Sequence, residues 1–192
     1  MRELYDHYSD PTEDCINIEG ICKLFEDLEL STEDETLFIL VHKMNASSWK
    51  SFTRLEFISG LEMLRLDTPK KIYNFIAQEK ESSDKLKFKQ VYNYAFYISS
   101  QDRKFLDVDT TIIILKMLLG DRNWVDEFCT YLQKSTVKKI NFDQWKIFYE
   151  FSCNIDKQLS NYNPTDAWPT LIDDFVVSLQ EQKDETKTQT EI

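Results

Sequence analysis

The stretch KINFDQWKIFYEFSCNIDKQLSNYNPTDAWPTLIDDFVVSL, residues 139–179, contains aromatic, acidic and turn-forming residues at a higher density than any other part of the chain. Asn141 is a candidate helix N-cap, and Trp145 and later aromatic residues follow it at helical spacing. Proline fixes φ and suits a turn or the first turn of a helix, so Pro164 and Pro169 predict a break before a second helix. We therefore expect two amphipathic helices here, with the rest of the fold organised around them.

Two acids in this stretch, Asp143 and Asp173, fall in the first turns of the two predicted helices. Carboxylates in a first turn are stabilised by the free N–H groups and by the helix dipole. Helix capping alone therefore explains both acids. Their neighbours in the sequence favour a second interpretation, in which they bind a partner.

The pattern of these neighbours resembles the C-terminal signature of the defective-in-cullin-neddylation family, whose domain is called potentiating neddylation, or PONY. A weaker resemblance extends from Tyr5 to about Gln180, and we expect a fungal-type member. The residues that carry the resemblance are Ile140, Asp143, Trp145, Ser160, Asn161, Tyr162, Ala167, Trp168, Pro169, Leu171, Ile172, Asp173, Asp174 and Phe175.

The resemblance implies a scaffold-type co-ligase that holds a cullin and a conjugating enzyme together so that the cullin receives a ubiquitin-like modifier. It places a patch for the cullin's C-terminal winged-helix region at Asp143, Ala167 and Asp173. Asn163 stands where relatives usually have Asp, which leaves the patch itself intact. The RING subunit bound to the cullin is a further expected partner, and we expect this chain to be a monomer.

The resemblance also implies an apolar pocket that takes the acetylated N-terminal methionine of the conjugating enzyme. Acetylation removes the terminal ammonium, whose burial without a partner would be costly. Three positions, Trp49, Ile98 and Ile114, depart from the residues usual in relatives, so the pocket should persist with an altered shape. Each pocket residue is also a sensible core residue. The expected pocket residues are Ile21, Leu37, Leu40, Trp49, Phe52, Ile98, Ile114 and Met117.

Composition favours a helical protein with a substantial core. The 192 residues include only 3 Gly and 4 Pro, too few for the many turns of a β-sandwich or barrel. We expect an all-α fold in which two EF-hand-like halves, about 1–82 and 83–182, pack into one elongated PONY domain without calcium. A flexible polar tail should follow over 183–192, and no internal repeat is visible in the sequence.

Local signals predict several helix boundaries. Ser31, with Asp34 three residues on, predicts an N-cap for a helix reaching about Met44. Thr53 and Glu56 predict a capping box for a helix through Leu64. Thr68-Pro69 predicts another start, and an apolar helix over 111–119 should begin at Asp107 or Asp109 and end at Gly120.

The charge balance excludes some classes of partner. Lys and Arg total 23 against 34 Asp and Glu, a formal net charge of −11. Such a chain is repelled by phosphate backbones and anionic lipid and attracted to basic protein surfaces, so we expect neither nucleic acid nor membrane as a partner. An acidic module for some other basic partner remains an alternative. Four cysteines without a CxxC pattern indicate reduced thiols and a cytoplasmic or nuclear protein.

Calcium binding and catalysis are both disfavoured. In a calcium loop that starts at Asp10, the glycine position holds Cys15; in one that starts at Asn45, it holds Lys50. A calcium-responsive EF-hand protein is therefore only an alternative. His7 and His42 have no Ser or Cys beside them to suggest a nucleophile pair, and no glycine-rich phosphate loop occurs. We expect a protein that is not an enzyme and needs no cofactor or metal.

Overall fold

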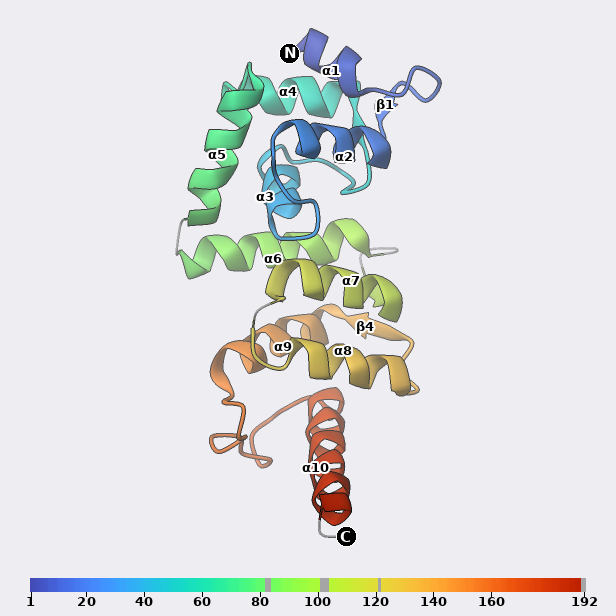
Figure 1. Ribbon diagram of the computed structural model, residues 1–192, viewed down its shortest axis with the longest axis vertical. Helices are drawn as coiled ribbons and strands as arrows, with labels where there is room; N and C mark the ends of the chain where they lie inside the picture. The colour runs from blue at the N-terminus through green and yellow to red at the C-terminus, as the bar shows by residue number, and fades with distance from the viewer. Residues whose placement is uncertain (82–83, 101–103, 121, 191–192) are drawn as a thin grey trace. The chain divides into compact units, whose positions relative to one another are not determined.

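The protein is mostly helical (Figure 1), as expected for an all-α fold. The computed structural model describes residues 1–81, 84–100, 104–120 and 122–190, and over 182–190 it describes the backbone alone. None of the helices in these ranges is long and apolar enough to cross a membrane. The chain forms two compact units, Met1–Ser99 and Ser100–Ile192.

The first unit packs helices around two short strands. Helix α3 contacts α5 and α6, α1 contacts α2 and α4, and β1 pairs antiparallel with β2. The sequence divided the chain near residue 82, whereas this unit continues to Ser99, because α6 packs on α3. Its elements are α1 (Arg2–Tyr8), β1 (Cys15–Ile16), α2 (Ile18–Asp27), α3 (Thr36–Lys43), β2 (Phe52–Thr53), α4 (Arg54–Leu64), α5 (Pro69–Glu81) and α6 (Lys85–Ser99).

The second unit has an aromatic core. Phe128 stacks on Phe148 with ring centroids 4.0 Å apart, and Phe175 meets Phe128 edge-on at 5.1 Å. These three rings join α8, α9 and α10, and the indole N–H of Trp124 donates to the Ile155 carbonyl at 2.9 Å. The elements are β3 (Phe105–Asp107), α7 (Val108–Leu119), α8 (Val125–Lys134), β4 (Lys139–Asn141), α9 (Phe142–Asn154) and α10 (Thr170–Thr190), with β3 antiparallel to β4.

Over the residues that the structure describes, one local motif occurs four times, twice in each unit. A buried apolar residue in a short strand precedes an N-cap whose side chain accepts from the backbone N–H three residues on. Residues four, seven and eight positions after the cap are buried in all four copies. The strand residue and cap of the four copies are Ile16 and Asn17, Phe52 and Thr53, Leu106 and Asp107, and Ile140 and Asn141. The fold is therefore internally repetitive, although the sequence shows no repeat, because the copies share burial and capping rather than residue identity.

The observed helix ends test the local signals. The capping box of Thr53 and Glu56, the cap at Asn141 and the helix start at Pro69 are confirmed. The start at Ser31 is wrong: α3 begins at Thr36, and the Ser31 hydroxyl accepts from the Glu33 N–H in a turn. At the chain end the backbone is helical to Thr190, so the flexible tail over 183–192 stays a prediction, and residues 191–192 lie outside the described part.

Candidate functional site

Asp143 is presented to solvent by the fourth copy of the repeated motif. Asn141 accepts from the Gln144 N–H, and the Gln144 side chain accepts from the Asn141 N–H, each at 2.9 Å, which fixes the first turn of α9. The Asp143 side chain is 79% exposed and pairs with Lys146 at 2.9 Å, one turn along the helix. An exposed pair of this kind contributes little to stability. The carboxylate is therefore free to exchange Lys146 for a cation on another protein.

Asp173 is held in place by a tyrosine from the preceding loop. It lies in the first turn of α10, half-buried, and its Oδ1 accepts a hydrogen bond from the Tyr162 hydroxyl. Burial and the nearby carboxylates of Asp173 and Asp166 raise the pKa of Tyr162 well above its ordinary value, so the hydroxyl keeps its proton. The described residues supply no donor to the second oxygen of Asp173. That oxygen remains open to a partner.

Ala167 lies in the coil over residues 155–169, which joins α9 to α10 (orange in Figure 1). It is exposed, and its neighbour Trp168 stacks on Tyr162 with ring centroids 5.9 Å apart while Phe151 meets Trp168 edge-on at 5.7 Å. The buried indole Nε1 of Trp168 has no hydrogen-bond partner among the described residues. The aromatic cluster thus fixes the backbone around a small side chain that leaves room for an approaching surface.

The coil takes its shape from polar side chains whose role the sequence analysis did not foresee. Asp156 accepts from the Ser160 N–H at 3.0 Å, and Asn161 both accepts from the Asp156 N–H and donates to the Asn154 carbonyl. Asn and Asp side chains commonly build turns in this way. The run of Ser160, Asn161 and Tyr162 therefore shapes the loop and positions Asp173. Asp156 is the signal that could have revealed this turn.

The three predicted patch residues come from three successive segments of the second unit: α9, the coil of residues 155–169 and the first turn of α10. Ala167 and Asp173 both adjoin the cluster of Phe151, Tyr162 and Trp168, whereas Asp143 lies two turns back along α9, about 12 Å from Phe151 along the helix axis. No described hydrogen bond or ion pair joins Asp143 to Asp173. Two acids and an exposed alanine are suited to meeting cations on a protein surface.

The predicted pocket residues are divided between the two units. Six lie in the first unit, and Ile114 and Met117 lie on α7 in the second. Trp49 and Ile98 keep part of their surface exposed, and Trp49 meets Phe38 at 5.8 Å between ring centroids. The other six are buried within the chain, at core positions: Ile21, Leu37, Leu40, Phe52, Ile114 and Met117. Their role as pocket residues stays a prediction.

Comparison with known proteins gives this geometry its context. The sequence model of the family described as "Cullin binding" matches residues 67–178, which include all three patch residues. Human DCN1-like protein 5 is 36% identical over 173 residues, 88% of this chain and 72% of the relative. DCN1-like protein 2 of Dictyostelium discoideum is 36% identical over 176 residues, 89% of this chain and 66% of the relative.

This chain belongs to the cullin-binding (PONY) family. The family resemblance expected from the residues of the C-terminal stretch is thereby confirmed. Of the pocket positions, Ile98, Ile114 and Met117 fall inside the match to the family model, and the other five precede it.

The two loops of this PONY protein that resemble calcium loops use their acids internally. Asp10 accepts from the Thr12 N–H at 2.7 Å and from Asn17 at 3.2 Å, and these hydrogen bonds lower the pKa of its carboxyl, those from Thr12 most. Glu56 accepts from the backbone N–H groups of Ser47 and Thr53. Over the described residues no group of three or more His, Cys, Asp or Glu side chains is placed to hold a metal ion. The carboxylates of Asp10 and Glu56 are therefore engaged by hydrogen bonds within their own loops.

Proposed function

We propose that this protein is a co-ligase for cullin neddylation that acts as a scaffold and forms no covalent intermediate. Its membership of the cullin-binding family supports a role in cullin neddylation. The observation that carries the finer proposal is that Asp143 and Asp173, both inside the family match, sit on fixed first turns with carboxylate oxygens accessible to a partner.

The cullin partner would supply Lys or Arg side chains from its C-terminal winged-helix region. Asp143 would exchange its exposed pair with Lys146, and Asp173 would offer the oxygen that Tyr162 leaves open. Ala167 would allow close approach between them. Charge pairs that become desolvated in an interface between proteins can dominate its energetics.

The second partner would be the conjugating enzyme with its N-terminus acetylated. Its methionine would enter the apolar region around Trp49 and Ile98, which retain exposed surface. Holding both partners raises their effective concentration and restricts their orientation. This would be the whole catalytic contribution, with no nucleophile of the chain's own. We further propose a cytoplasmic or nuclear protein that also meets the cullin-bound RING subunit.

The cullin proposal is tested by titration calorimetry of this chain against a cullin C-terminal winged-helix fragment. Asp143→Lys and Asp173→Lys should each weaken binding at least about tenfold, because each replaces an attraction by a repulsion. Asp109→Lys is the matched control: Asp109 is exposed and holds the same place in the third motif copy as Asp143 in the fourth. Equal losses of affinity in all three variants would show that binding depends on overall negative charge rather than on these two acids. No binding by the wild type would refute the proposal.

The pocket proposal has a separate test. A peptide with the conjugating enzyme's N-terminal sequence should bind much more tightly when acetylated, because the free ammonium would be desolvated without a partner. The Asp143→Lys variant should bind this peptide as the wild type does. Equal affinity for the acetylated and free peptides would refute the pocket.

A further inference from the structure

A groove runs along helix α5 in the first unit, on the side that faces residues 27–36. It consists of two adjoining hollows of about 370 and 420 Å³, which share Glu29 and Tyr73 in their walls. On α5 the wall residues recur at helical spacing from Pro69 to Glu81, so they form one face along the whole helix. The two hollows therefore form one continuous α5 groove.

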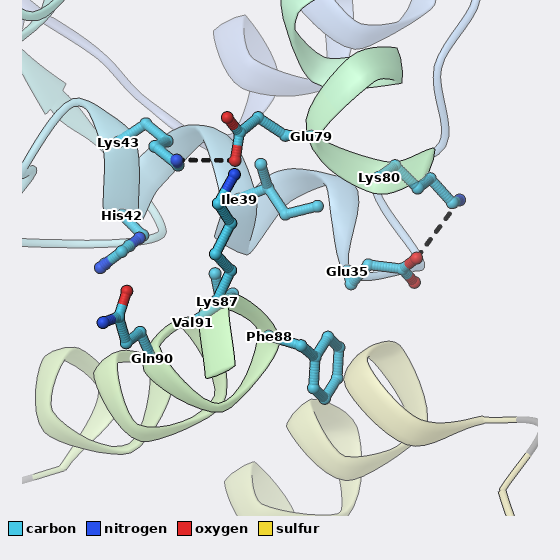
Figure 2. Close-up of a pocket in the computed structure, with 10 residues that line it drawn as sticks. All are labelled: Glu35, Ile39, His42, Lys43, Glu79, Lys80, Lys87, Phe88, Gln90 and Val91. Carbon is cyan, nitrogen blue, oxygen red and sulfur yellow. Dashed lines mark ion pairs between the residues drawn. The ribbon is translucent and has the colours of Figure 1, made fainter. Parts of the chain in front are cut away.

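The other side of α5 is closed. There α5 meets α3 and α6 around a space of only about 50 Å³, and Glu79 pairs with Lys43 at 2.6 Å (Figure 2). Lys80 lies at the border of the two sides, where it pairs with Asp34 at 2.6 Å and lies 3.7 Å from Glu35. The α5 groove is thus the side of this helix that is open to a partner.

The floor of the α5 groove is apolar. Ile76 is fully buried there, while Leu30 and Ala77 keep part of their surface exposed. Tyr73, where the two hollows join, is 42% exposed. A large aromatic ring with a polar tip suits an interface between proteins, because covering the ring removes apolar area from water.

The end of α2 fixes the wall opposite Tyr73. Glu29 adopts a left-handed backbone with a φ of 54°, and its N–H donates to the Glu26 carbonyl at 2.9 Å. The Leu30 N–H donates to the Phe25 carbonyl, also at 2.9 Å. Helices often end in this way with a glycine, whereas here the residue carries a carboxylate. The wall is therefore set before a partner binds, which lowers the entropy cost of binding.

The charges around the α5 groove leave a negative excess. Residues 26–35 contain six acids and no Lys or Arg, and α5 contains two glutamates and three lysines, together eight acids against three lysines. His7, 3.6 Å from Asp27, would remove at most one of these charges. The side chains of Glu29 and Glu81, both in the walls, have no ion pair or hydrogen bond among the described residues. The groove therefore favours a cationic partner.

The length of the groove indicates the size of its occupant. The 13 residues of α5 span about 20 Å, at about 1.5 Å per residue. An extended chain rises about 3.3 Å per residue and directs alternate side chains to one face. About six extended residues would therefore cover the groove, with two or three side chains facing it.

We propose that the α5 groove binds an extended segment of a partner protein in which an apolar side chain lies between two Lys or Arg residues at alternate positions. The apolar side chain packs on Tyr73 and Leu30, and the cations meet Glu29 and Glu81. This surface is separate from both proposed partner sites. Asp143 and Asp173 lie in the other unit, and none of the eight predicted pocket residues lines the groove.

The peptide acetyl-KAFAK-amide is a suitable probe, because in an extended chain its two lysines and its phenylalanine share one face. In an NMR titration at about 0.15 M salt, where distant charges are screened, it should shift the amide resonances of residues 27–36 and 69–81 saturably. The matched peptide acetyl-KASAK-amide, which lacks the apolar side chain, should bind at least about fivefold more weakly. The charge-reversed acetyl-EAFAE-amide should not bind.

Variants locate the charged part of the site. Glu29→Lys combined with Glu81→Lys should weaken binding of the probe at least about tenfold, because two attractions become repulsions. Glu13→Lys is the matched control: Glu13 is exposed in the loop before β1 and lies outside the groove, so its replacement should change the affinity less than about twofold.

A second pair of variants tests the apolar part. Tyr73→Ala should weaken binding about fivefold, and Tyr73→Phe should retain it, because the ring supplies the contact. Leu55→Ala is the control for an exposed apolar side chain: Leu55 is 76% exposed on α4, outside the groove, and its replacement should leave the affinity unchanged.

Four results would overturn the proposal: no shift at residues 27–36 and 69–81, equal affinity for acetyl-KASAK-amide, equal losses in the double variant and in Glu13→Lys, or wild-type affinity in a folded Tyr73→Ala. Displacement of the probe by the acetylated N-terminal peptide of the conjugating enzyme would also overturn it, by making the groove part of that enzyme's site. The cullin proposal is tested apart from this one. Asp143→Lys should leave the affinity for the probe unchanged, and the double variant should bind the winged-helix fragment as the wild type does.

Discussion

The two units share a pair of structural motifs and differ in the elements added to that pair. Each contains two copies of the motif of a buried strand residue, a capping residue and a helix, and in each the two strands pair antiparallel. The second unit adds the coil of residues 155–169, which positions Ala167 and Asp173. The first adds α5 and α6, and α5 forms a groove with residues 27–36. Ala167 and Asp173 thus depend on a part that the units do not share, whereas Asp143 is presented by the shared motif.

The largest loss of stability is expected from a substitution at Gly20, in helix α2 of the first motif copy. A Cβ there would lie 2.1 Å from the Tyr8 carbonyl oxygen, and a backbone atom cannot move aside easily. We expect Gly20→Ala to lower the free energy of unfolding by about 3 kcal/mol, measured by urea denaturation. Gly60→Ala is the comparison: its Cβ would meet the Met44 side chain, with the Cβ at 2.8 Å and the Cγ and Cε at 3.0 Å, so Met44 must shift, and the cost should be smaller, about 1 kcal/mol. Equal losses of unfolding free energy in the two variants would show that α1 and α2 are not closely packed at Gly20.

Equivalence of the four motif copies predicts similar costs for removing their caps. Alanine at Asn17, Thr53, Asp107 or Asn141 should each lower the free energy of unfolding by about 1 kcal/mol, because each side chain satisfies a free N–H of its helix. Ser31→Ala, at a cap expected from sequence but absent from the structure, should change it by less than about 0.5 kcal/mol. A cost at Ser31 as large as at the four caps would contradict the motif.

A smaller effect concerns the loop that only the second unit has. Tyr162→Phe removes the hydroxyl that donates to Asp173 while keeping the ring against Trp168. We expect affinity for the winged-helix fragment to fall about threefold in calorimetry, since Asp173 loses its fixed orientation. The same substitution at Tyr131, whose ring packs in the core of the same unit, should leave the affinity unchanged. An unaltered affinity in Tyr162→Phe would mean that Asp173 needs no positioning.

The smallest effect is a pH dependence confined to the first unit, which holds both histidines. Burial, and secondarily the charge of Lys43, lower the pKa of His42 below 6.5 in the folded state, although Glu79 opposes this. The unfolded state therefore takes up this proton first as the pH falls. The stabilising contribution of His42 to the free energy of unfolding is complete above about pH 6.5 and is lost progressively below it. His42→Phe should flatten the fall in unfolding free energy between about pH 7 and about pH 5; an unchanged slope would contradict the assignment.

Local chemistry made part of the structure predictable. Thr53 with Glu56 and Asn141 with its aromatic followers form caps that depend on neighbours within one turn, and both are present as expected. The prediction at Ser31 was wrong because a serine hydroxyl accepts the same kind of hydrogen bond in a helix cap and in a turn, and here it forms a turn. The fourfold motif was invisible because Ile16 and Phe52, for example, share only their burial.

The sites depend on contacts between residues that lie apart in the sequence. Asp143, Ala167 and Asp173 could be named from the family resemblance, but the hydroxyl that holds Asp173 comes from Tyr162, eleven positions earlier. The α5 groove required that helix to meet residues 27–36, and no local pattern encodes such a meeting. Local spacing therefore foretold the helices, while the shape of each site followed from packing.

The most direct test of the scaffold proposal is the rate of cullin neddylation as this protein's concentration is raised in a reconstituted reaction. A protein that only tethers two partners should accelerate the reaction to a maximum and then inhibit it, because at excess each partner binds a separate copy. The variant carrying both Asp143→Lys and Asp173→Lys should give no acceleration. A rate that rises to a plateau without decline, or acceleration by the variant equal to that of the wild type, would contradict the account.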